Sequence, residues 1–281
     1  MPHHRADRLA TLYLFHPLHR ISAGEEARVP VLMYHSISNG NGQSVHPYYE
    51  TTTSVEIFAQ QMRFLHDDGY SAMDMRELLK FVTYGKPLGK SVAITFDDGY
   101  GDFYTEAFPI LSRYGFAATV FLPTGYIGKT TKQFKNKDCL TWDEVRELHR
   151  AGVTFGSHTV THPQLAQSTS RELENELRQS KDTIEDEIGT PVRSFSYPFA
   201  FPEGNRRFTG RLRDTLQACG YECGVCTAVG TVGPDEDRFF LKRLPVNSWD
   251  DGLLFKAKLE GGYDWLHGLQ YATKLMKASL S

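Results

Sequence analysis

The chain has 281 residues, which is typical of a single β/α barrel and also allows two smaller domains. Its composition, 40% hydrophobic and 23% charged residues, is that of an ordinary globular protein with ample material for a core. A net charge of −3 and a pI near 6.4 give no electrostatic case for binding nucleic acid or an anionic membrane surface.

Residues 1–28 are predicted to be an N-terminal extension, ahead of a single domain over residues 29–281. Their apolar run, Leu9 to Leu18, is interrupted by His16 and Pro17, so it is too short and too broken to span a membrane. No convincing small-residue cleavage site follows this run. We therefore expect no integral membrane segment, no secretion signal and a cytoplasmic location.

From Val29 onward, short apolar strands alternate with helices. The predicted strands cover residues 31–35, 92–96, 117–122, 153–155, 193–196 and 221–227. The predicted helices open at capping boxes on Thr53, Thr141 and Thr169, and also cover residues 75–81, 103–114 and 206–219. This alternation favours a parallel sheet with crossover helices. We expect an α/β fold, a distorted (β/α) barrel of about seven parallel strands.

The pattern changes after Arg243. Residues 250–261 and 263–281 are predicted to form additional C-terminal helices, packed on the outside of the barrel or on a partner. In the long helix that follows Thr169, the alternating acidic and basic residues around Glu176 are interpreted as a solvated face.

Three of the four cysteines form a pattern that needs its own interpretation. Cys219, Cys223 and Cys226 have the C-x3-C-x2-C spacing of the iron–sulfur motif in radical SAM enzymes. Here, however, the motif spans a predicted helix end at Gly220 and the following strand, whereas ligands to one cluster come from one loop. We interpret these residues, with Cys139, as reduced cysteines that pack as small hydrophobic side chains.

Two adjacent carboxylates end one of the predicted strands. In Ser91 to Tyr100, SVAITFDDGY, an apolar run stops on Asp97 and Asp98 and turns at Gly99. Parallel β/α barrels present their chemistry at the carboxyl ends of strands in this way. Asp-Asp-Gly is also good turn chemistry on its own, so the functional interpretation depends on the rest of the chain.

A pair of histidines follows another predicted strand. His158 and His162 are four residues apart, so they face the same side of either a helical or an extended backbone. Two imidazoles and one carboxylate, with room left for water, make the open three-ligand site of a catalytic zinc. Thr159 stands where the HExxH metalloprotease motif has glutamate, which excludes that motif. An ordinary pair of surface histidines is the alternative.

Together the two segments resemble the polysaccharide deacetylases, the family 4 carbohydrate esterases. The first two motifs of that family read TFDDG and H-[ST]-x-x-H, and they match Thr95 to Gly99 and His158 to His162. The resemblance covers roughly residues 30–245. We expect one divalent metal ion, zinc in the first instance, held by Asp98, His158 and His162.

A third segment, Phe195 to Ala200, reads FSYPFA and resembles a variant of the family segment that ends in Pro-Tyr-Gly. Phe199 and Ala200 replace the last two residues of that segment. Ser196 occupies the position where many family members carry an arginine. Asp97, the predicted general base, therefore lacks its usual ionic partner.

Two arginines are candidates to supply the missing charge beside Asp97. Arg243 lies on a predicted neighbouring strand and is the preferred candidate. Arg193 begins a strand, so it lies at the wrong end. A structural surface ion pair is the alternative for both residues.

The two adjacent acids are predicted to have different roles. With Asp98 bound to the ion, Asp97 is placed to take the proton of the attacking water as general base. A backbone N–H in the Phe199 region is the candidate to stabilise the oxyanion together with the metal. Tyr34, Pro198 and Phe199 are the predicted substrate contacts.

His35 is predicted to be the general acid. Most family members use a histidine in a C-terminal Leu-x-His motif, but here Leu266-His267 lies inside a predicted helix with no strand before it. Some exopolysaccharide deacetylases of the family are circularly permuted, with this histidine on the first strand, and VLMYH at residues 31–35 resembles theirs. His267 is the rival donor, and a core histidine is the alternative interpretation of His35.

The hypothesis from the sequence is a metal-dependent hydrolase that removes N-acetyl groups from an amino sugar of a glycan or glycan precursor. Its expected partner is the N-acetylated saccharide, with no nucleic acid. A non-catalytic carbohydrate-binding relative and a hydrolase of small cyclic amides are the alternatives. A free Asp97 argues against the binding protein, because binding alone needs no general base.

Overall fold

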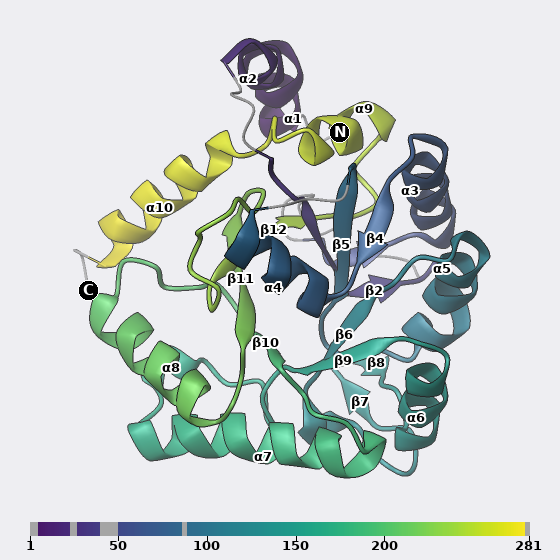
Figure 1. Cartoon of the computed structure of the whole chain (residues 1–281), viewed down its shortest axis with the longest axis vertical. Helices are drawn as coiled ribbons and strands as arrows, with labels where there is room; N and C mark the ends of the chain where they lie inside the picture. The colour runs from purple at the N-terminus through teal and green to yellow at the C-terminus, as the bar shows by residue number, and fades with distance from the viewer. Residues whose placement is uncertain (1–4, 23–26, 40–49, 86–88, 279–281) are drawn as a thin grey trace.

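A closed ring of parallel strands forms the centre of the molecule (Figure 1). The computed structural model describes residues 5–22, 27–39, 50–85 and 89–278. Over these residues, seven strands follow the order β1-β12-β11-β10-β9-β6-β5, and β1 pairs with β5 to close the ring. An eighth strand, β4, pairs in parallel with the first half of β5. The prediction of a barrel of about seven parallel strands is confirmed.

The barrel strands are short and largely buried, whereas β4 is buried only at Met73. Their bounds are β1 (Val31–Tyr34), β4 (Ser71–Met73), β5 (Ser91–Phe96), β6 (Thr119–Leu122), β9 (Thr154–Ser157), β10 (Ser194–Ser196), β11 (Cys223–Val229) and β12 (Leu241–Pro245). Two small pairs lie outside the barrel, namely β2 (Ser36–Ile37) with β3 (Thr52–Thr53), and β7 (Gln133–Phe134) with β8 (Lys137–Asp138).

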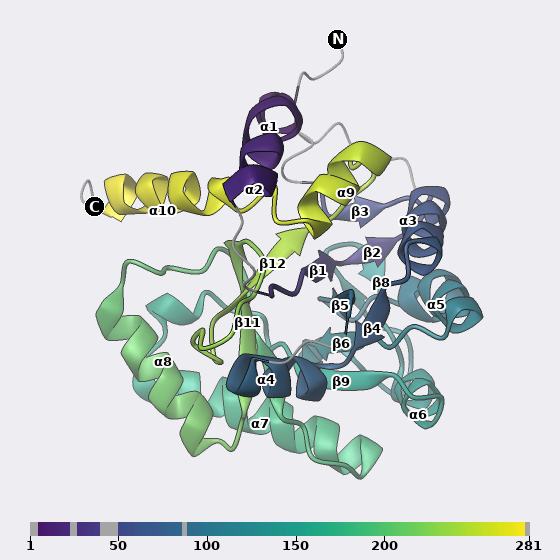
Figure 2. The same cartoon turned by 45° about the horizontal axis from the view of Figure 1, so that its top comes forward.

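Helices surround this barrel, as Figures 1 and 2 show. Their bounds are α3 (Val55–Asp67), α4 (Met75–Tyr84), α5 (Phe108–Tyr114, continuing the π-helical η2, Phe103–Ala107), α6 (Trp142–Arg150), α7 (Ser170–Ile188), α8 (Arg206–Ala218), α9 (Gly252–Leu259) and α10 (Trp265–Ala278). Short 3-10 turns are η3 (Thr124–Tyr126) and η4 (Leu165–Gln167). No helix within the described ranges is both long and apolar enough to cross a bilayer.

The chain begins with a helix that the sequence analysis did not predict. It consists of α1 (Ala6–Ala10), the π-helical η1 (Thr11–Phe15) and α2 (His16–Ser22) in direct succession, and we call it the N-terminal helix. It packs on α9, so part of the predicted extension lies against the C-terminal helices. The other residues of the extension, apart from Arg5, Ala27 and Arg28, lie outside the described ranges.

Capping residues set most of the helix starts. Thr141 and Thr169 form the predicted capping boxes, in which side chain and backbone exchange hydrogen bonds with a glutamate three residues on. The prediction at Thr53 is wrong by one residue, because Thr53 belongs to β3 and pairs with Ile37. The N-cap there is Ser54, whose hydroxyl accepts the backbone N–H of the third helical residue.

The amino end of the barrel is closed by α4, which lies across the centre of the view in Figure 1. Its buried side chains, among them Leu78 and Phe81, belong to one apolar cluster with barrel residues such as Val31, Ala93 and Val225. Burial of each such side chain contributes roughly 1.5–3 kcal/mol. The centre of this end of the barrel is therefore a packed core.

The cysteines do not form a cluster. Cys223 lies in the core at the amino end, with its sulfur 4.0 Å from the carbonyl oxygen of Met75. Cys226, three residues on along the strand, points its sulfur to the other side and contacts the carbonyl oxygen of Phe240 at 3.4 Å. All four cysteines are buried and none of them forms a disulfide with another described residue, as expected for apolar packing. An iron–sulfur interpretation is thereby excluded for Cys219, Cys223 and Cys226.

Candidate active site

The predicted site residues come from several strands of the ring and meet at the carboxyl end of the barrel. Asp97 follows β5 directly, and its N–H donates to the carbonyl oxygen of Tyr34 at the end of β1, 3.0 Å away. His35 is the next residue after this carbonyl. His158 follows β9, whereas Arg243 lies within β12. Parallel pairing of the strands brings these residues to one rim.

A left-handed turn separates the two adjacent acids. Asp98 has φ of 71° and Gly99 has φ of 61°. Aspartate tolerates this conformation better than most residues. At the next position a Cβ would lie 2.9 Å from Cδ2 of Leu122 in a left-handed backbone conformation, so glycine is favoured there. This turn allows two consecutive carboxylates to reach different partners.

The carboxylate of Asp97 is fully paired inside the barrel. The guanidinium of Arg243 donates to it twice, through Nη1 to Oδ1 at 2.8 Å and Nη2 to Oδ2 at 2.7 Å. The Ser196 hydroxyl adds a third bond to Oδ1 at 3.0 Å. The remaining guanidinium N–H groups donate to Ser196, Thr95 and the carbonyl of Cys226. Five hydrogen bonds thus fix a guanidinium that is wholly buried.

This pairing keeps Asp97 ionised. Burial alone would raise the pKa of its carboxyl, but the charge of Arg243 more than offsets that effect and holds the pKa well below its usual range. Arg193, the other candidate from the sequence, lies at the start of β10 and pairs with Glu222 at the surface. Arg243 on β12 therefore supplies the positive charge that many family members carry at the position of Ser196.

Asp98 contacts a different set of groups. Its Oδ2 accepts hydrogen bonds from the Tyr100 hydroxyl at 3.0 Å and from Nζ of Lys135 at 3.1 Å. Its Oδ1 is buried without a hydrogen-bond partner, and lies 3.5 Å from Nε2 of His158 and 3.4 Å from Nε2 of His162. These three ligand-type atoms lie within 4.8 Å of one another.

The histidine tautomers suit metal binding. Nδ1 of His158 lies 2.7 Å from the carbonyl oxygen of Ser196, so Nδ1 carries the proton and leaves the Nε2 lone pair facing Asp98. Burial lowers the pKa of His162, which favours its neutral imidazole. Burial would raise the pKa of Asp98, but the closeness of the two imidazole rings holds it far below the usual range. An orphaned carboxylate oxygen between two imidazole nitrogens fits a divalent cation.

The loop that carries both histidines is held from α7. The carboxylate of Glu176 accepts from the N–H groups of Val160 and Thr161 at 2.7 and 2.9 Å, and from the Thr161 hydroxyl. Within the loop, Thr159 has φ of 69° and its hydroxyl accepts the N–H of His162. The interpretation of Glu176 as part of a solvated face is wrong, because it positions the histidine loop.

The two candidate proton donors have different surroundings. His35 is half-buried beside the acids: burial lowers its pKa, and the charges of Asp98 and Asp97 oppose that shift. Among the described residues, no hydrogen bond holds its ring. His267, by contrast, pairs through Nε2 with the carboxylate of Glu203 at 2.8 Å, on the outer helix α10.

The three predicted substrate contacts lie in different places. Phe199 is 45% exposed, and its ring packs against His162 with centroids 4.6 Å apart. Pro198 is buried behind it. Tyr34 is fully buried, stacks on Phe96 and donates its hydroxyl to Gln61 at 2.8 Å. The structure therefore contradicts the prediction for Tyr34: it faces the helix layer because alternate β1 residues point outward.

The sequence analysis missed two residues that hold Asp98. Tyr100 follows the turn directly, so its position next to the Asp-Asp-Gly segment was an available signal. Lys135 lies in the tight connection between β7 and β8, over the rings of Phe134 and, at 5.8 Å, Phe199. No motif in the sequence marks that residue, because its role depends on a loop folding back over the site.

Comparisons with known proteins identify the family of the chain. Residues 84–224 match the family model for polysaccharide deacetylases. A putative polysaccharide deacetylase of Bacillus subtilis, YxkH, is 33% identical over 241 residues, covering 85% of this chain and 79% of the relative. The chain belongs to the polysaccharide deacetylase family. It is thus an enzyme of the class that hydrolyses N-acetyl amide bonds of sugars.

More distant polysaccharide deacetylases share the fold. A poly-β-1,6-N-acetyl-D-glucosamine N-deacetylase of Staphylococcus aureus is 22% identical over 249 residues, which cover 83% of this chain and 82% of the relative. The deacetylase PplD of Streptococcus pyogenes, solved with acetate, superposes with a TM-score of 0.72 at 24% identity, over 83% of this chain and 99% of that structure. IcaB from Ammonifex degensii superposes with a TM-score of 0.70 at 21% identity, over 83% and 97%.

Proposed function

We propose that this polysaccharide deacetylase is a metal-dependent de-N-acetylase of an amino sugar in a glycan or glycan precursor. The observation that carries the proposal is the buried, unpartnered Oδ1 of Asp98, which lies between Nε2 of His158 and Nε2 of His162. These residues would hold one divalent ion, for which zinc fits the ligand types. Such an ion, when bound, supplies Lewis acidity that polarises an amide carbonyl and lowers the pKa of water.

Asp97 acts as the general base. It lies next to Asp98 in sequence, yet none of its hydrogen bonds goes to the histidines. The low pKa that Arg243 imposes keeps its carboxylate ionised at neutral pH, ready to accept the proton of the attacking water. Arg243 and Ser196 also fix its orientation, so little reorganisation is needed during the reaction.

His35 donates the proton that the departing amine needs. It lies at the same rim as Asp97, and its half-buried ring has no competing hydrogen bond within the described part of the chain. The backbone N–H of Phe199 has no hydrogen-bond acceptor among the described residues, and this residue lies in a left-handed turn with φ of 61°. That N–H is our candidate for stabilising the oxyanion.

A polymeric β-linked N-acetylglucosamine is the substrate to test first. The Staphylococcus aureus relative acts by name on poly-β-1,6-N-acetyl-D-glucosamine. The exposed ring of Phe199 beside the metal ligands provides an apolar surface against which the acetyl group or a sugar face can pack. A cyclic amide would leave this open rim largely unused.

The test is acetate release from defined oligosaccharides by purified protein. We expect release from β-1,6-linked or β-1,4-linked N-acetylglucosamine oligomers, loss of release after chelation, and recovery on adding zinc. An Asp97→Asn variant is the matched control, because it should bind the ion and release little acetate. If no N-acetylated glycan yields acetate while the protein binds the ion, the proposed substrate class is wrong.

A further inference from the structure

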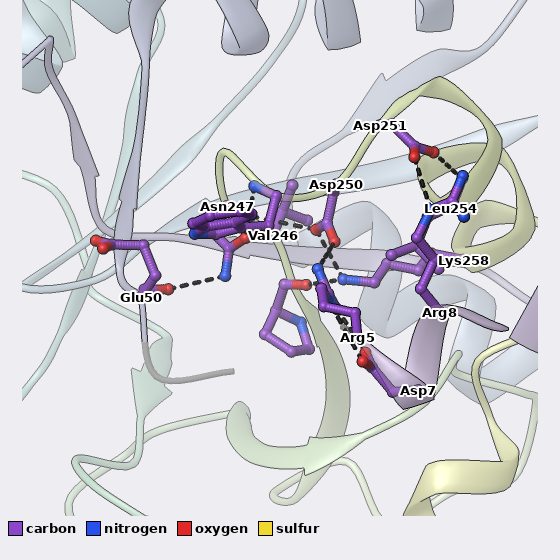
Figure 3. A network of polar contacts seen from close by, with 12 residues as sticks. Arg5, Asp7, Arg8, Glu50, Val246, Asn247, Asp250, Asp251, Leu254 and Lys258 are labelled. Carbon is purple, nitrogen blue, oxygen red and sulfur yellow. Dashed lines mark hydrogen bonds and ion pairs between the residues drawn. The ribbon is translucent and has the colours of Figure 1, made fainter. Parts of the chain in front are cut away.

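The N-terminal helix is attached to the domain through its polar face. Nη1 of Arg5, just before the helix, donates to Oδ1 of Asp250 at 2.9 Å. Nε of Arg8 donates to Asp251 at 2.7 Å, as Figure 3 illustrates for this network. Further along, the ring of His16 lies 2.7 Å from the carboxylate of Glu260. The inner face of this helix thus consists largely of charged contacts.

Aromatic packing completes the inner face. Phe15 stacks on Trp265 with ring centroids 4.4 Å apart. The indole N–H of Trp265 donates to the hydroxyl of Thr11, which is fully buried. The helix is therefore docked in a defined orientation and cannot rotate without breaking both kinds of contact.

The outer face of the same helix is apolar. Eight residues between positions 5 and 21 are exposed, and seven of them are apolar or aromatic, the exception being Arg20. The seven are Ala6, Leu9, Tyr13, Leu14, Pro17, Leu18 and Ile21. Tyr13 is 77% and Ile21 84% exposed. Their spacing of three and four residues places them along one side of the helix.

This arrangement is the reverse of an ordinary surface helix, which buries its apolar stripe and exposes its polar side. Here ion pairs hold the polar side on the domain, so the apolar stripe is presented to the surroundings. Figures 1 and 2 show the helix at the periphery of the molecule, beyond α9 and the start of α10. A contiguous exposed apolar surface of this kind is typical of an interaction site.

We propose that the outer face of the N-terminal helix binds the surface of a phospholipid bilayer. A helix with one strongly apolar face lies in the interfacial plane and buries that face at the boundary between headgroups and acyl chains. Tyr13 and Arg20 suit the headgroup level, because one end of each side chain is polar. The near-neutral charge of the chain means that apolar burial drives this binding, so zwitterionic phosphatidylcholine, which has no net charge, is sufficient as the lipid.

A second copy of the chain fits this face less well. Stable protein interfaces use about 20–30 residues on each side. The stripe offers seven exposed residues on one convex helix, and its neighbours Asp251 and Glu260 are occupied in ion pairs with the helix itself. A bilayer requires no complementary shape, so a single helix face can bind it.

The docking contacts join this helix to the active-site end of the barrel. Asp250 lies in the loop after β12, the strand that carries Arg243. It accepts from Arg5 and also from the buried ammonium of Lys258 at 2.7 Å. Binding of the helix to a membrane would therefore hold the carboxyl end of the barrel at a fixed orientation to the lipid surface.

Flotation of the full chain with phosphatidylcholine vesicles tests the proposal. We expect the protein to float with the vesicles at both low and high salt, and Leu14→Glu/Leu18→Glu to weaken binding by about tenfold or more. Tyr84→Glu is the matched control, because Tyr84 is 73% exposed on α4 at the opposite end of the barrel. Circular dichroism confirms that each variant is folded, and Tyr13→Ser/Ile21→Ser provides a second pair if the first fails to fold.

Two results would overturn the proposal. One is equal flotation of the wild-type chain and both pairs of variants, or no flotation of the wild-type chain. The other is a dimer in sedimentation velocity that Leu14→Glu/Leu18→Glu converts to a monomer, which would show that a second copy covers this face. Neither result depends on the deacetylase activity.

Discussion

Two buried networks of charged residues lie at the carboxyl end of the barrel, and they differ in how completely their members are paired. In the docking network of Figure 3, Asp250 accepts from both Arg5 and Lys258. Asp7 likewise accepts from Arg5 and from the hydroxyl of Tyr263. None of these side chains contains a buried polar atom without a partner.

In the active-site network, one of the two acids is fully paired and the other is not. Asp97 and Arg243 satisfy each other, whereas Asp98 keeps a buried oxygen that faces two imidazoles without a hydrogen bond. Leaving a buried charged atom unpaired is costly unless another ligand binds it. The difference suits the two proposed roles, in which full pairing fixes Asp97 and the unpaired oxygen of Asp98 is available to a cation.

The largest expected effect concerns His35, the proposed proton donor. His35→Ala should lower kcat by about 10²- to 10⁴-fold, because it removes the proton donor to the leaving amine. His267→Ala is the matched control and should be nearly silent, since His267 is committed to Glu203 on the outside of the barrel. Steady-state acetate release measures both. A silent His35→Ala variant would show that the donor lies elsewhere.

Breaking the ion pair between Asp97 and Arg243 should lower the free energy of unfolding. Arg243→Met leaves Asp97 buried without its partner, and we expect a loss of about 3–5 kcal/mol in the free energy of unfolding. The double variant Asp97→Asn/Arg243→Met removes both charges and should recover most of that loss. Urea unfolding of the three proteins provides the comparison. If the double variant is as unstable as the single one, the pair is not what stabilises this part of the core.

The same type of substitution in the docking network should cost less. Arg5→Met removes one of two cations from Asp250, and Lys258 remains 2.7 Å away. We therefore expect a loss of about 1–3 kcal/mol. Urea unfolding of Arg5→Met beside Arg243→Met compares the two losses in unfolding free energy directly. A loss equal to that of Arg243→Met would mean that Lys258 does not compensate.

Acidification should reduce the contribution of the Asp97–Arg243 ion pair to the free energy of unfolding. Its pKa is lowered in the folded protein, so the pair stabilises the fold fully above the ordinary carboxyl pKa of about 3.9, and this contribution is lost as the pH falls from there toward the folded pKa. The stability difference between wild type and Arg243→Met should accordingly shrink below about pH 4. Unfolding curves at pH 7 and below pH 4 measure this change, and a constant difference would contradict it.

Much of the candidate site could be predicted from the sequence, because the carboxylate and histidine motifs are local patterns. The strand that ends on Asp97 and Asp98 and the spacing of His158 and His162 predicted both the barrel rim and the metal-binding group. Arg243 could be proposed only as a candidate, because its pairing depends on β12 lying next to β1 in the closed ring.

Other features depend on tertiary contacts that no local pattern encodes. Glu176 resembles any exposed glutamate of a charged helix until the histidine loop folds onto it. Tyr34 was predicted to contact the substrate, but the alternation of side chains along β1 turns it into the helix layer. The N-terminal helix was missed because its apolar residues face outward and its charged residues face the domain.

The most direct test compares the metal content and the activity of two variants, Asp97→Asn and Asp98→Asn. The account predicts one divalent ion per chain for the wild type and for Asp97→Asn, with turnover of Asp97→Asn reduced by about 10²- to 10⁴-fold. It predicts little or no bound ion for Asp98→Asn, because that change weakens the one carboxylate ligand. An Asp97→Asn variant without metal, beside an Asp98→Asn variant that keeps it, would contradict the assignment of the two acids.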